Sequence, residues 1–391
     1  MTREELDAQI AALGDTDYVV RGTACGGELR AFASVGRYLQ GPGAITHLPE
    51  MTERLGRTAI MFLGSHFYDR EVGRIRALFS DSGTVISFHK ISGHGTAPDV
   101  EAFKALIARE PVSPEVVIGL GGGKTLDTVR IAAAQLDLRM ILVPTSAATN
   151  AATSGLSVLY DEAGGAKTVY LRHNPDGILV DTEYVAQGSA RMLAAGFADS
   201  LATYFEARNN WLANNINTVM PGYRRTLCGK AIAAACLETL LQNGEAAFRA
   251  AQSGLRTEAF EDTVEAINLL SGLGWENNGC SITHAMTPAL SVLPETREKM
   301  HGECVAFCLL VQLVLDREPS ERFQEVYRLC RTLGLPVSLR ELGIPQDSAR
   351  DAAQRITERA FALKDTLEVA NYPVTPGSLY NAILYLDAMS R

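Results

Sequence analysis

Short apolar runs alternate with segments of helical periodicity between about residues 57 and 181. The apolar runs predict β-strands at 58–65, 84–91, 115–120 and 139–146, and the segments between them predict helices at 69–83, 97–110 and 124–137. Strands and helices in strict alternation are typical of a parallel sheet covered by helices. The first half of the chain is therefore predicted to be an α/β domain with a Rossmann-like parallel sheet.

The pattern changes after Asp181, where β-branched runs become rare. Apolar positions recur at helical spacing in 189–215, 229–252 and 258–274, and this helical periodicity continues to the end of the chain. We therefore predict an all-helical second domain and divide the chain into domains at 1–185 and 186–391. The sequence assigns no role to residues 1–34, although a helical extension over the first thirty or so residues is expected.

Composition narrows the classes of protein to which the chain can belong. With 391 residues, 47% of them hydrophobic and 21% charged, it has the balance of a globular protein long enough for two domains. A formal net charge of −9 without a long Lys/Arg run argues against nucleic acid and anionic membranes as partners. The N-terminus lacks the apolar core of a signal peptide, and the longest apolar stretch, 304–315, is too short to span a bilayer. Seven scattered cysteines indicate reduced thiols and hence a cytoplasmic protein.

Three adjacent glycines and a lysine follow the third predicted strand, in "VVIGLGGGKTLDT" (116–128). A Walker-type phosphate loop would need glycine at Ile118, and a Rossmann fingerprint starting at Gly119 would need glycine at Lys124, so neither motif fits. Glycines between a strand and a helix still allow a pyrophosphate to approach the free N–H groups of that helix. Either this turn binds a phosphate group or it is a tight connection without a ligand.

The segment 143–164, "VPTSAATNAATSGLSVLYDEAG", is the second unusual stretch. Short polar side chains gather there within thirteen residues: Thr145, Ser146, Thr149, Asn150, Thr153, Ser154 and Ser157. We expect a long loop at the carboxyl end of the fourth predicted strand, suited to hydrogen bonds with a sugar or a diphosphate.

Three candidate metal ligands lie in the helical half of the chain: Asp199, His284 and His301. Each is surrounded in sequence by small and apolar residues, so each is expected on a half-buried helix face. A buried carboxylate needs a partner, and one carboxylate with two imidazoles leaves the open position that a catalytic zinc requires. The alternative is that the three are hydrogen-bonded polar groups of the core, because they come from separate segments and match no short motif.

Five motifs resemble the glycerol dehydrogenase branch of the iron-containing (group III) alcohol dehydrogenase family, whose branch members often use zinc. They are "GLGGGKTLDT", "VPTSAATNAATSGLSVLYDEAG", "NPDGILVDTEYV", "AGFADSLATYFEAR" and "THAMTPALSVLPETREKMHGECVAF", and the resemblance runs from about residue 35 to the C-terminus. It implies an α/β domain that binds a nicotinamide dinucleotide, a helical domain that holds the metal, and an active site in the cleft, in a dehydroquinate synthase-like architecture. A homo-oligomer is also expected.

The resemblance assigns roles to individual residues of this chain. It places the diphosphate of NAD along Gly122, Gly123, Lys124, Thr125 and Asp127. It places the rest of the cofactor along Thr145, Ser146, Ala148, Ser154, Leu156 and Tyr160, and it places the metal, zinc rather than iron, on Asp199, His284 and His301. The implied reaction is hydride transfer between NAD and a small alcohol or carbonyl compound, with the metal stabilising the substrate hydroxyl as an alkoxide.

The chain departs from the family pattern at three positions. Asn150 stands where glycerol dehydrogenases typically have an aspartate that faces the second hydroxyl of the substrate, which favours a 2-hydroxy or 2-keto acid, as in hydroxycarboxylate dehydrogenases. Thr287 stands where many members have a further histidine, which argues against iron. Ser65 stands where an acidic residue often binds the adenine ribose, so both NAD and NADP are open as cofactors. The alternative from another class is 3-dehydroquinate synthase, an NAD- and zinc-dependent lyase whose metal-binding carboxylate has a different local pattern.

Overall fold

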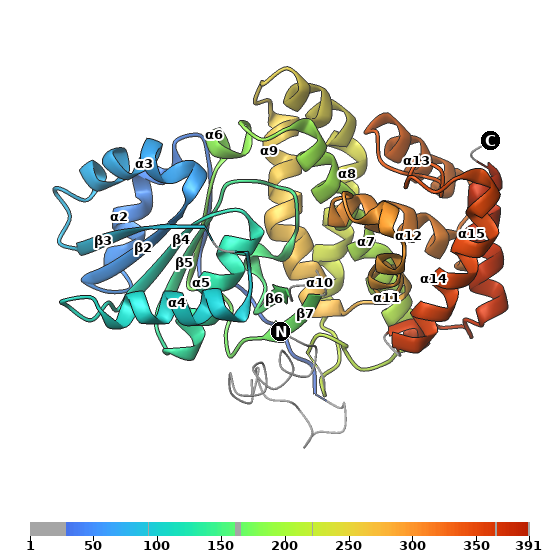
Figure 1. The fold of residues 1–391 in the computed structure, drawn as a ribbon, viewed down its shortest axis with the longest axis horizontal. Helices are drawn as coiled ribbons and strands as arrows, with labels where there is room; N and C mark the ends of the chain where they lie inside the picture. Colours follow the sequence, from blue (N-terminus) through green and yellow to red (C-terminus); the bar gives the residue numbers. More distant parts are fainter. Residues whose placement is uncertain (1–28, 93, 161–165, 221, 364–365, 390–391) are drawn as a thin grey trace. The chain divides into compact units, whose positions relative to one another are not determined.

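The structure is a computed structural model that describes residues 29–92, 94–160, 166–220, 222–363 and 366–389. The helical extension expected over the first thirty or so residues lies almost wholly outside these described residues. The chain divides into two units, whose elements are labelled in Figure 1. The first unit contains Ala33–Ser146 and Ala151–Gly188, and the second contains Ala147–Asn150 and Ser189–Arg391.

A six-stranded sheet forms the centre of the first unit, with strands in the order β1-β8-β5-β4-β2-β3 and every neighbouring pair parallel. The strands are β1 (Tyr38–Gly41), β2 (Thr58–Gly64), β3 (Val85–Ile91), β4 (Val116–Gly121), β5 (Arg139–Pro144) and β8 (Gly177–Asp181). The four strands expected from the sequence correspond to β2, β3, β4 and β5, so the predicted parallel sheet is confirmed. The apolar pattern does not predict β1 and β8, because four and five residues are too few to show a period.

Helices cover both faces of this sheet, as Figure 1 shows: α2 (Leu48–Glu53), α3 (Ser65–Leu78), α4 (Ala97–Ala108) and α5 (Gly123–Gln135), with the short α6 (Thr182–Val185) after β8. One face carries Met61 of β2 and Ile118 of β4, which share a buried cluster with Ile75 of α3. The opposite face carries Phe62, whose ring stacks on Phe103 of α4 with centroids 4.8 Å apart. Burial on both faces explains why these strand segments are apolar throughout.

The segment 143–164 is partly regular rather than one long loop. Residues 151–160 contain a 3₁₀ turn, η2 (Ala151–Thr153), and the strand β6 (Leu156–Tyr160), which pairs antiparallel with β7 (Ala166–Tyr170). Leu156 and Leu159 are buried, and β6 packs against α5. The expectation of a loop is therefore wrong for much of residues 151–160, because the many hydroxyl groups of this segment obscure the short, largely apolar strand at 156–160.

A buried arginine of α5 holds the η2–β6 segment in place. Arg130 is 1% exposed. Its Nη1 donates to the carbonyl oxygens of Ala151 and Ser154 at 3.2 and 3.3 Å and also to that of Leu156, while Nη2 donates to the Ala152 carbonyl at 3.2 Å. A charge buried this deeply needs several acceptors, and the backbone of η2 and β6 supplies them.

The second unit is built of helices around two long ones, α7 and α8, of 24 and 26 residues. Its helices are α7 (Ala190–Ala213), α8 (Leu227–Gln252), α9 (Glu258–Glu265), α10 (Gly272–Asn278), α11 (Ile282–Met286), α12 (His301–Leu315), α13 (Ser320–Thr332), α14 (Ala349–Leu363) and α15 (Pro376–Met389), with a π-helical turn, η3 (Ala266–Ser271), between α9 and α10. α12 is buried from Gly302 to Leu313 and packs against α7 and α15. This organisation confirms the predicted fold class.

Two further observations concern the chain as a whole. Among the described helices, none combines the length and the apolar character needed to cross a membrane. The cysteines in the described part of the chain are free thiols, four of them buried, which agrees with the expected lack of a disulfide framework.

Candidate active site

The turn between β4 and α5 carries the glycine run found in the sequence. β4 ends at Gly121, Gly122 precedes the helix, and α5 begins at Gly123. No side chain of the described residues caps the first N–H groups of α5, and its first turn contains no acidic residue. These N–H groups and the helix dipole are therefore available to an anion.

Gly121 and Gly122 lack a side chain for different physical reasons. A Cβ atom added to Gly121 would lie 2.8 Å from the Thr125 side chain, so packing within the unit requires glycine there. A Cβ atom on Gly122 would have no neighbour within 4 Å, and its φ of −81° suits any residue. The fold therefore does not need glycine at 122, and the close approach of a ligand is the physical reason left for it.

Several of the residues predicted to bind the cofactor lie around this turn. The Lys124 ammonium lies over the Tyr160 ring, 4.9 Å from its centroid. The Thr145 N–H donates to the Gly121 carbonyl at 3.1 Å, which joins the end of β5 to the glycine turn. Ser146 follows in a half-buried position. The carboxyl ends of β4 and β5 thus present the predicted cofactor residues together, as expected for a parallel sheet.

Other predicted cofactor residues make different contacts. Burial raises the pKa of Asp127 to about 6, against the opposing effects of the Arg130 charge and a hydrogen bond from the Val158 backbone N–H. Ser154 is buried and donates its hydroxyl to a carbonyl of η2 at 2.8 Å. Asp127 and Ser154 therefore support the packing of α5 on the η2–β6 segment. Ala148 belongs to the second unit.

The three candidate metal ligands meet in the second unit, although they come from three elements. Asp199 lies in the middle of α7, His284 in the five-residue α11, and His301 at the first position of α12. Oδ1 of Asp199 lies 3.3 Å from Nε2 of His284 and 3.5 Å from Nε2 of His301. The three ligand atoms lie within 4.8 Å of one another, and one carboxylate oxygen with two imidazole nitrogens fits a divalent metal such as zinc.

Burial and charge differ among the three. The side chain of Asp199 is 2% exposed, that of His284 17% and that of His301 47%. Burial alone would raise the pKa of Asp199, but the two histidines hold it well below its usual range. Burial likewise opposes the charged form of His284, but the carboxylates of Glu206 and Asp199 raise its pKa well above the ordinary value. The carboxylates thus favour a positive charge here, whether a proton or a metal ion carries it.

A close contact between α7 and α12 places His301 beside Asp199. Gly302 follows His301, and a Cβ atom added to Gly302 would lie 1.8 Å from the Ala195 carbonyl oxygen. Because that oxygen belongs to a helix backbone and cannot turn aside, only glycine permits this separation of the two helices. Ala195 precedes Asp199 by about one helical turn, so the point of closest approach lies next to the metal ligands.

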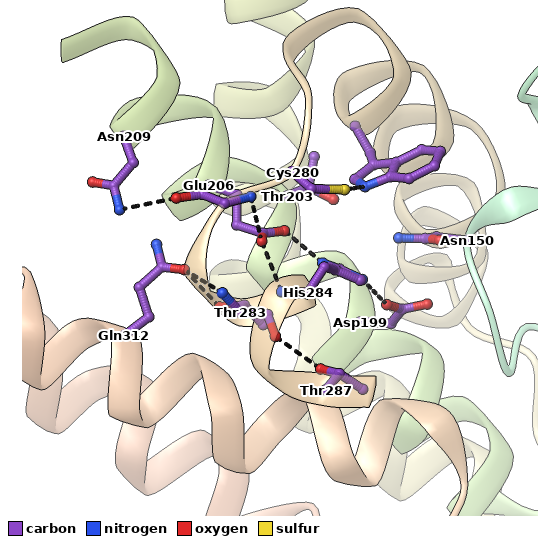
Figure 2. A network of polar contacts seen from close by, with 12 residues as sticks. Asn150, Asp199, Thr203, Glu206, Asn209, Cys280, Thr283, His284, Thr287 and Gln312 are labelled. Atoms are coloured by element: carbon purple, nitrogen blue, oxygen red, sulfur yellow. Dashed lines mark hydrogen bonds and ion pairs between the residues drawn. The ribbon is translucent and has the colours of Figure 1, made fainter. Parts of the chain in front are cut away.

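The sequence did not lead us to two buried side chains beside the triad, Glu206 of α7 and Gln312 of α12, which Figure 2 shows within the polar network. Glu206 Oε2 lies 2.6 Å from Nδ1 of His284. Gln312 Oε1 accepts hydrogen bonds from the N–H and the hydroxyl of Thr283 at 2.9 and 2.7 Å. A signal existed for Glu206, which stands seven positions after Asp199 and therefore on the same helix face. No pattern relates Gln312 to α11.

Asn150, predicted to face the substrate, is buried in the second unit with 7% of its surface exposed. Its Nδ2 donates to Ser271 Oγ at 2.9 Å, and Ser271 Oγ lies 2.8 Å from Thr203 Oγ1. Ser271 ends the π-helical turn η3, a type of turn found frequently at functional sites. Thr203 lies about one turn after Asp199 on α7, so these hydrogen bonds connect Asn150 to the helix that carries the metal-binding carboxylate.

Comparison with known proteins covers both units. A model of the iron-containing alcohol dehydrogenase family matches residues 36–182. The chain is 38% identical to a glycerol dehydrogenase of Thermotoga maritima, over 91% of this chain and 96% of that protein. It is 30% identical to hydroxycarboxylate dehydrogenase A of Escherichia coli, over 89% of this chain and 94% of that protein. Among solved structures, a probable glycerol dehydrogenase from Sinorhizobium meliloti matches with a TM-score of 0.83 and 34% identity, over 92% of this chain and 99% of that one.

We predict that Gly122→Val weakens NADH binding at least about tenfold, or by about 1.4 kcal/mol, and lowers the melting temperature only slightly, because valine is less favourable than glycine at the N-cap of α5. The new side chain enters open space in the fold but occupies the approach to the N–H groups of α5. Fluorescence titration with NADH and thermal unfolding measure the two effects. Gly73→Val, which also enters open space, is the matched control. Unchanged affinity in a folded Gly122→Val protein would refute the turn as the cofactor site.

We predict that Gly302→Ala lowers the free energy of unfolding by roughly 1–3 kcal/mol and weakens metal binding, because α12 must move away from the Ala195 carbonyl. Thermal unfolding of the metal-free protein and competition with a chromogenic chelator are the measurements. Gly377→Ala adds the same methyl group to α15 where no described atom lies within 4 Å, so it should not lower the free energy of unfolding and should leave metal binding unchanged. If Gly302→Ala behaves like this control, the close contact does not position His301.

Proposed function

Because the chain belongs to the iron-containing alcohol dehydrogenase family and is an NAD-linked oxidoreductase of a small alcohol, we propose how its residues divide that activity. Residues 1–185 bind the dinucleotide, and residues 186–391 hold a divalent metal and the reacting group of the substrate. The observation that carries the proposal is the donor set made by Asp199, His284 and His301. A 3-dehydroquinate synthase-like lyase is not favoured, because the similar proteins described above are oxidoreductases.

We infer that the pyrophosphate of NAD lies at the start of α5, against Gly122, Gly123 and the Lys124 ammonium. The uncapped N–H groups of the helix and the open space above Gly122 support this position. Arg130 would keep the η2–β6 segment, and with it Tyr160, in place for the cofactor. The remaining residues of the proposed site in the first unit are Thr125, Thr145, Ser146, Ser154 and Leu156. When bound, NAD supplies the ring that accepts or donates the hydride.

We infer that the metal is zinc, held by Oδ1 of Asp199 and by Nε2 of both histidines. Three protein ligands of this kind suit a catalytic zinc, which keeps a coordination position open. Thr287, where many family members carry a histidine, donates its hydroxyl to the Thr283 carbonyl at 2.9 Å and adds no ligand. When bound, the metal supplies a Lewis acid that lowers the pKa of the substrate hydroxyl.

The substrate that we propose is a small 2-hydroxy acid or its 2-keto partner rather than glycerol. Asn150 is a neutral amide, whereas an aspartate there would add a further negative charge to those of Asp199 and Glu206. At an effective dielectric constant of about 20, two like charges about 4 Å apart repel by about 4 kcal/mol, enough to exclude a carboxylate. The bond to Ser271 holds the amide in place.

We also propose that the protein is a homo-oligomer of the cytoplasm. The described cysteines are free, and Cys228 is an exposed thiol, which suits a reducing compartment. Closed symmetric assemblies of identical chains are the commonest form of soluble oligomer.

His301→Ala should lose the metal, and its turnover should fall by more than roughly 100-fold. Loss of a residue that only supports a metal ligand typically costs roughly 10–100-fold, and loss of a ligand itself should cost more. His301 is the most exposed of the three ligands, so its removal disturbs packing least. Elemental analysis measures the metal, NADH absorbance measures turnover, and NADH fluorescence should show that cofactor affinity is retained. His47→Ala, at an exposed histidine of the first unit, is the control. Full metal content with normal turnover in His301→Ala would exclude the proposed metal site.

Asn150→Asp should shift preference from 2-keto acids towards dihydroxyacetone. Asn150 Nδ2 donates to Ser271 Oγ, and the introduced carboxylate can instead accept from the Ser271 hydroxyl, so the change alters the charge more than the fold. The measurement is the ratio of kcat/KM for 2-oxobutyrate to that for dihydroxyacetone in both proteins. A wild-type protein that prefers dihydroxyacetone, or a ratio that ignores the substitution, would return glycerol-type chemistry as the better proposal.

A further inference from the structure

We propose that Glu206 is a positioning residue that determines which nitrogen of His284 faces the metal. The inference rests on the proposed metal site and deepens it, because it concerns how one of the three ligands is presented. Glu206 itself lies on α7, seven positions after Asp199, and its side chain is fully buried.

Both oxygens of the Glu206 carboxylate are engaged by α11 and the residue before it. Oε1 accepts hydrogen bonds from the backbone N–H groups of Ser281 and His284, at 2.8 and 2.9 Å. Oε2 lies 2.6 Å from Nδ1 of the His284 ring. One side chain of α7 therefore binds both the backbone and the ring of His284.

The chemistry of these groups determines where the ring carries its proton. An ionised carboxylate can only accept, so the short contact with Oε2 requires a proton on Nδ1. In a neutral imidazole the other nitrogen, Nε2, then has a free lone pair, and Nε2 is the atom that lies 3.3 Å from Asp199 Oδ1. Glu206 thus selects the tautomer in which Nε2 can bind a metal.

A second side chain, Gln312 of α12, also binds α11. α11 has five residues, far too few to be stable alone, and no side chain at its own N-terminus caps it. Gln312 of α12 accepts from the N–H and the hydroxyl of Thr283, and its Nε2 donates to Asp316 at 3.3 Å. Glu206 and Gln312 therefore satisfy the N–H groups of His284 and Thr283 near the start of α11, as Figure 2 shows, and hold His284 against rotation.

The same region offers one competing interpretation. Glu206, Cys280 and His284 also bring possible ligand atoms within 4.8 Å of one another, so Nδ1 of His284 could instead bind a second metal. The Cys280 sulfur, however, accepts a hydrogen bond from Trp275 Nε1 at 2.6 Å, and the Glu206 oxygens are taken by three N–H donors. These contacts favour orientation of the ring over metal binding on this side.

Glu206→Gln tests the proposal because it preserves shape while reversing one hydrogen bond. The amide oxygen can still accept from the two backbone N–H groups, but its nitrogen must donate to Nδ1 of His284. The ring proton then moves to Nε2, which can no longer bind a metal. We expect Zn²⁺ affinity, measured by chelator competition, to fall about 10–100-fold while the far-ultraviolet circular dichroism spectrum stays unchanged. Glu71→Gln, at a buried carboxylate of the first unit, is the matched control and should bind Zn²⁺ as the wild type does.

A measurement on the wild type keeps the proposal testable even if the variant does not fold. ¹⁵N NMR of the Zn²⁺-loaded protein should show His284 with a protonated Nδ1 and a metal-bound Nε2. A metal-bound Nδ1, as the Cys280 alternative requires, overturns the proposal, and so does wild-type Zn²⁺ affinity in Glu206→Gln. Failure of the metal site itself is distinguishable, because then His301→Ala also keeps its Zn²⁺; loss of Zn²⁺ in His301→Ala but not in Glu206→Gln refutes only the positioning role.

Discussion

The carboxylate of Asp199 lies inside a helical bundle with almost no access to water, and the arrangement of the second unit follows from that charge. An ionised group this deeply buried is strongly unfavourable unless cations or hydrogen-bond donors surround it. Two helices each bring an imidazole to it, and each approach needs its own support. α12 comes close because residue 302 lacks a side chain, whereas the short α11 is held by side chains of its neighbours. The long α7 therefore carries the buried charge of Asp199 and also, through Glu206, helps to hold α11 beside it.

The proposed cofactor site of the first unit and the proposed metal site of the second would bind charged ligands by different physical means. At the start of α5, backbone N–H groups and a helix dipole favour an anion, and the main requirement on the turn is that no side chain blocks its approach. Around Asp199, side-chain atoms do the binding, so ring orientation and helix position decide the outcome. The first arrangement depends on residues that lack a side chain, while the second depends on buried hydrogen bonds that leave little freedom.

The apolar pattern predicted the middle of the first unit's sheet, because β2, β4 and β5 are apolar along most of their length. Residue types and their context also pointed to Asp199, His284 and His301, although only the resemblance to a known family brought them together. The pattern could not reveal Arg130 or Gln312, because a single helix shows its own apolar face but not the backbone groups of the segment it meets. Asp127 shows the same limit, because no sequence pattern predicts that the Val158 backbone N–H of β6 donates to its carboxyl.

Four residues from the middle of the first unit's sequence, Ala147–Asn150, belong to the second unit. α7 approaches them so closely that a Cβ atom on Gly196 would lie 1.9 Å from the Ala147 carbonyl oxygen. During synthesis these four residues leave the ribosome before α7 exists, so they reach their final place only after the later helix has formed. In evolution the same contact ties two distant stretches of the gene together. The two halves of this protein therefore cannot readily be exchanged with those of relatives, because a change in residues 147–150 requires a matching change in α7.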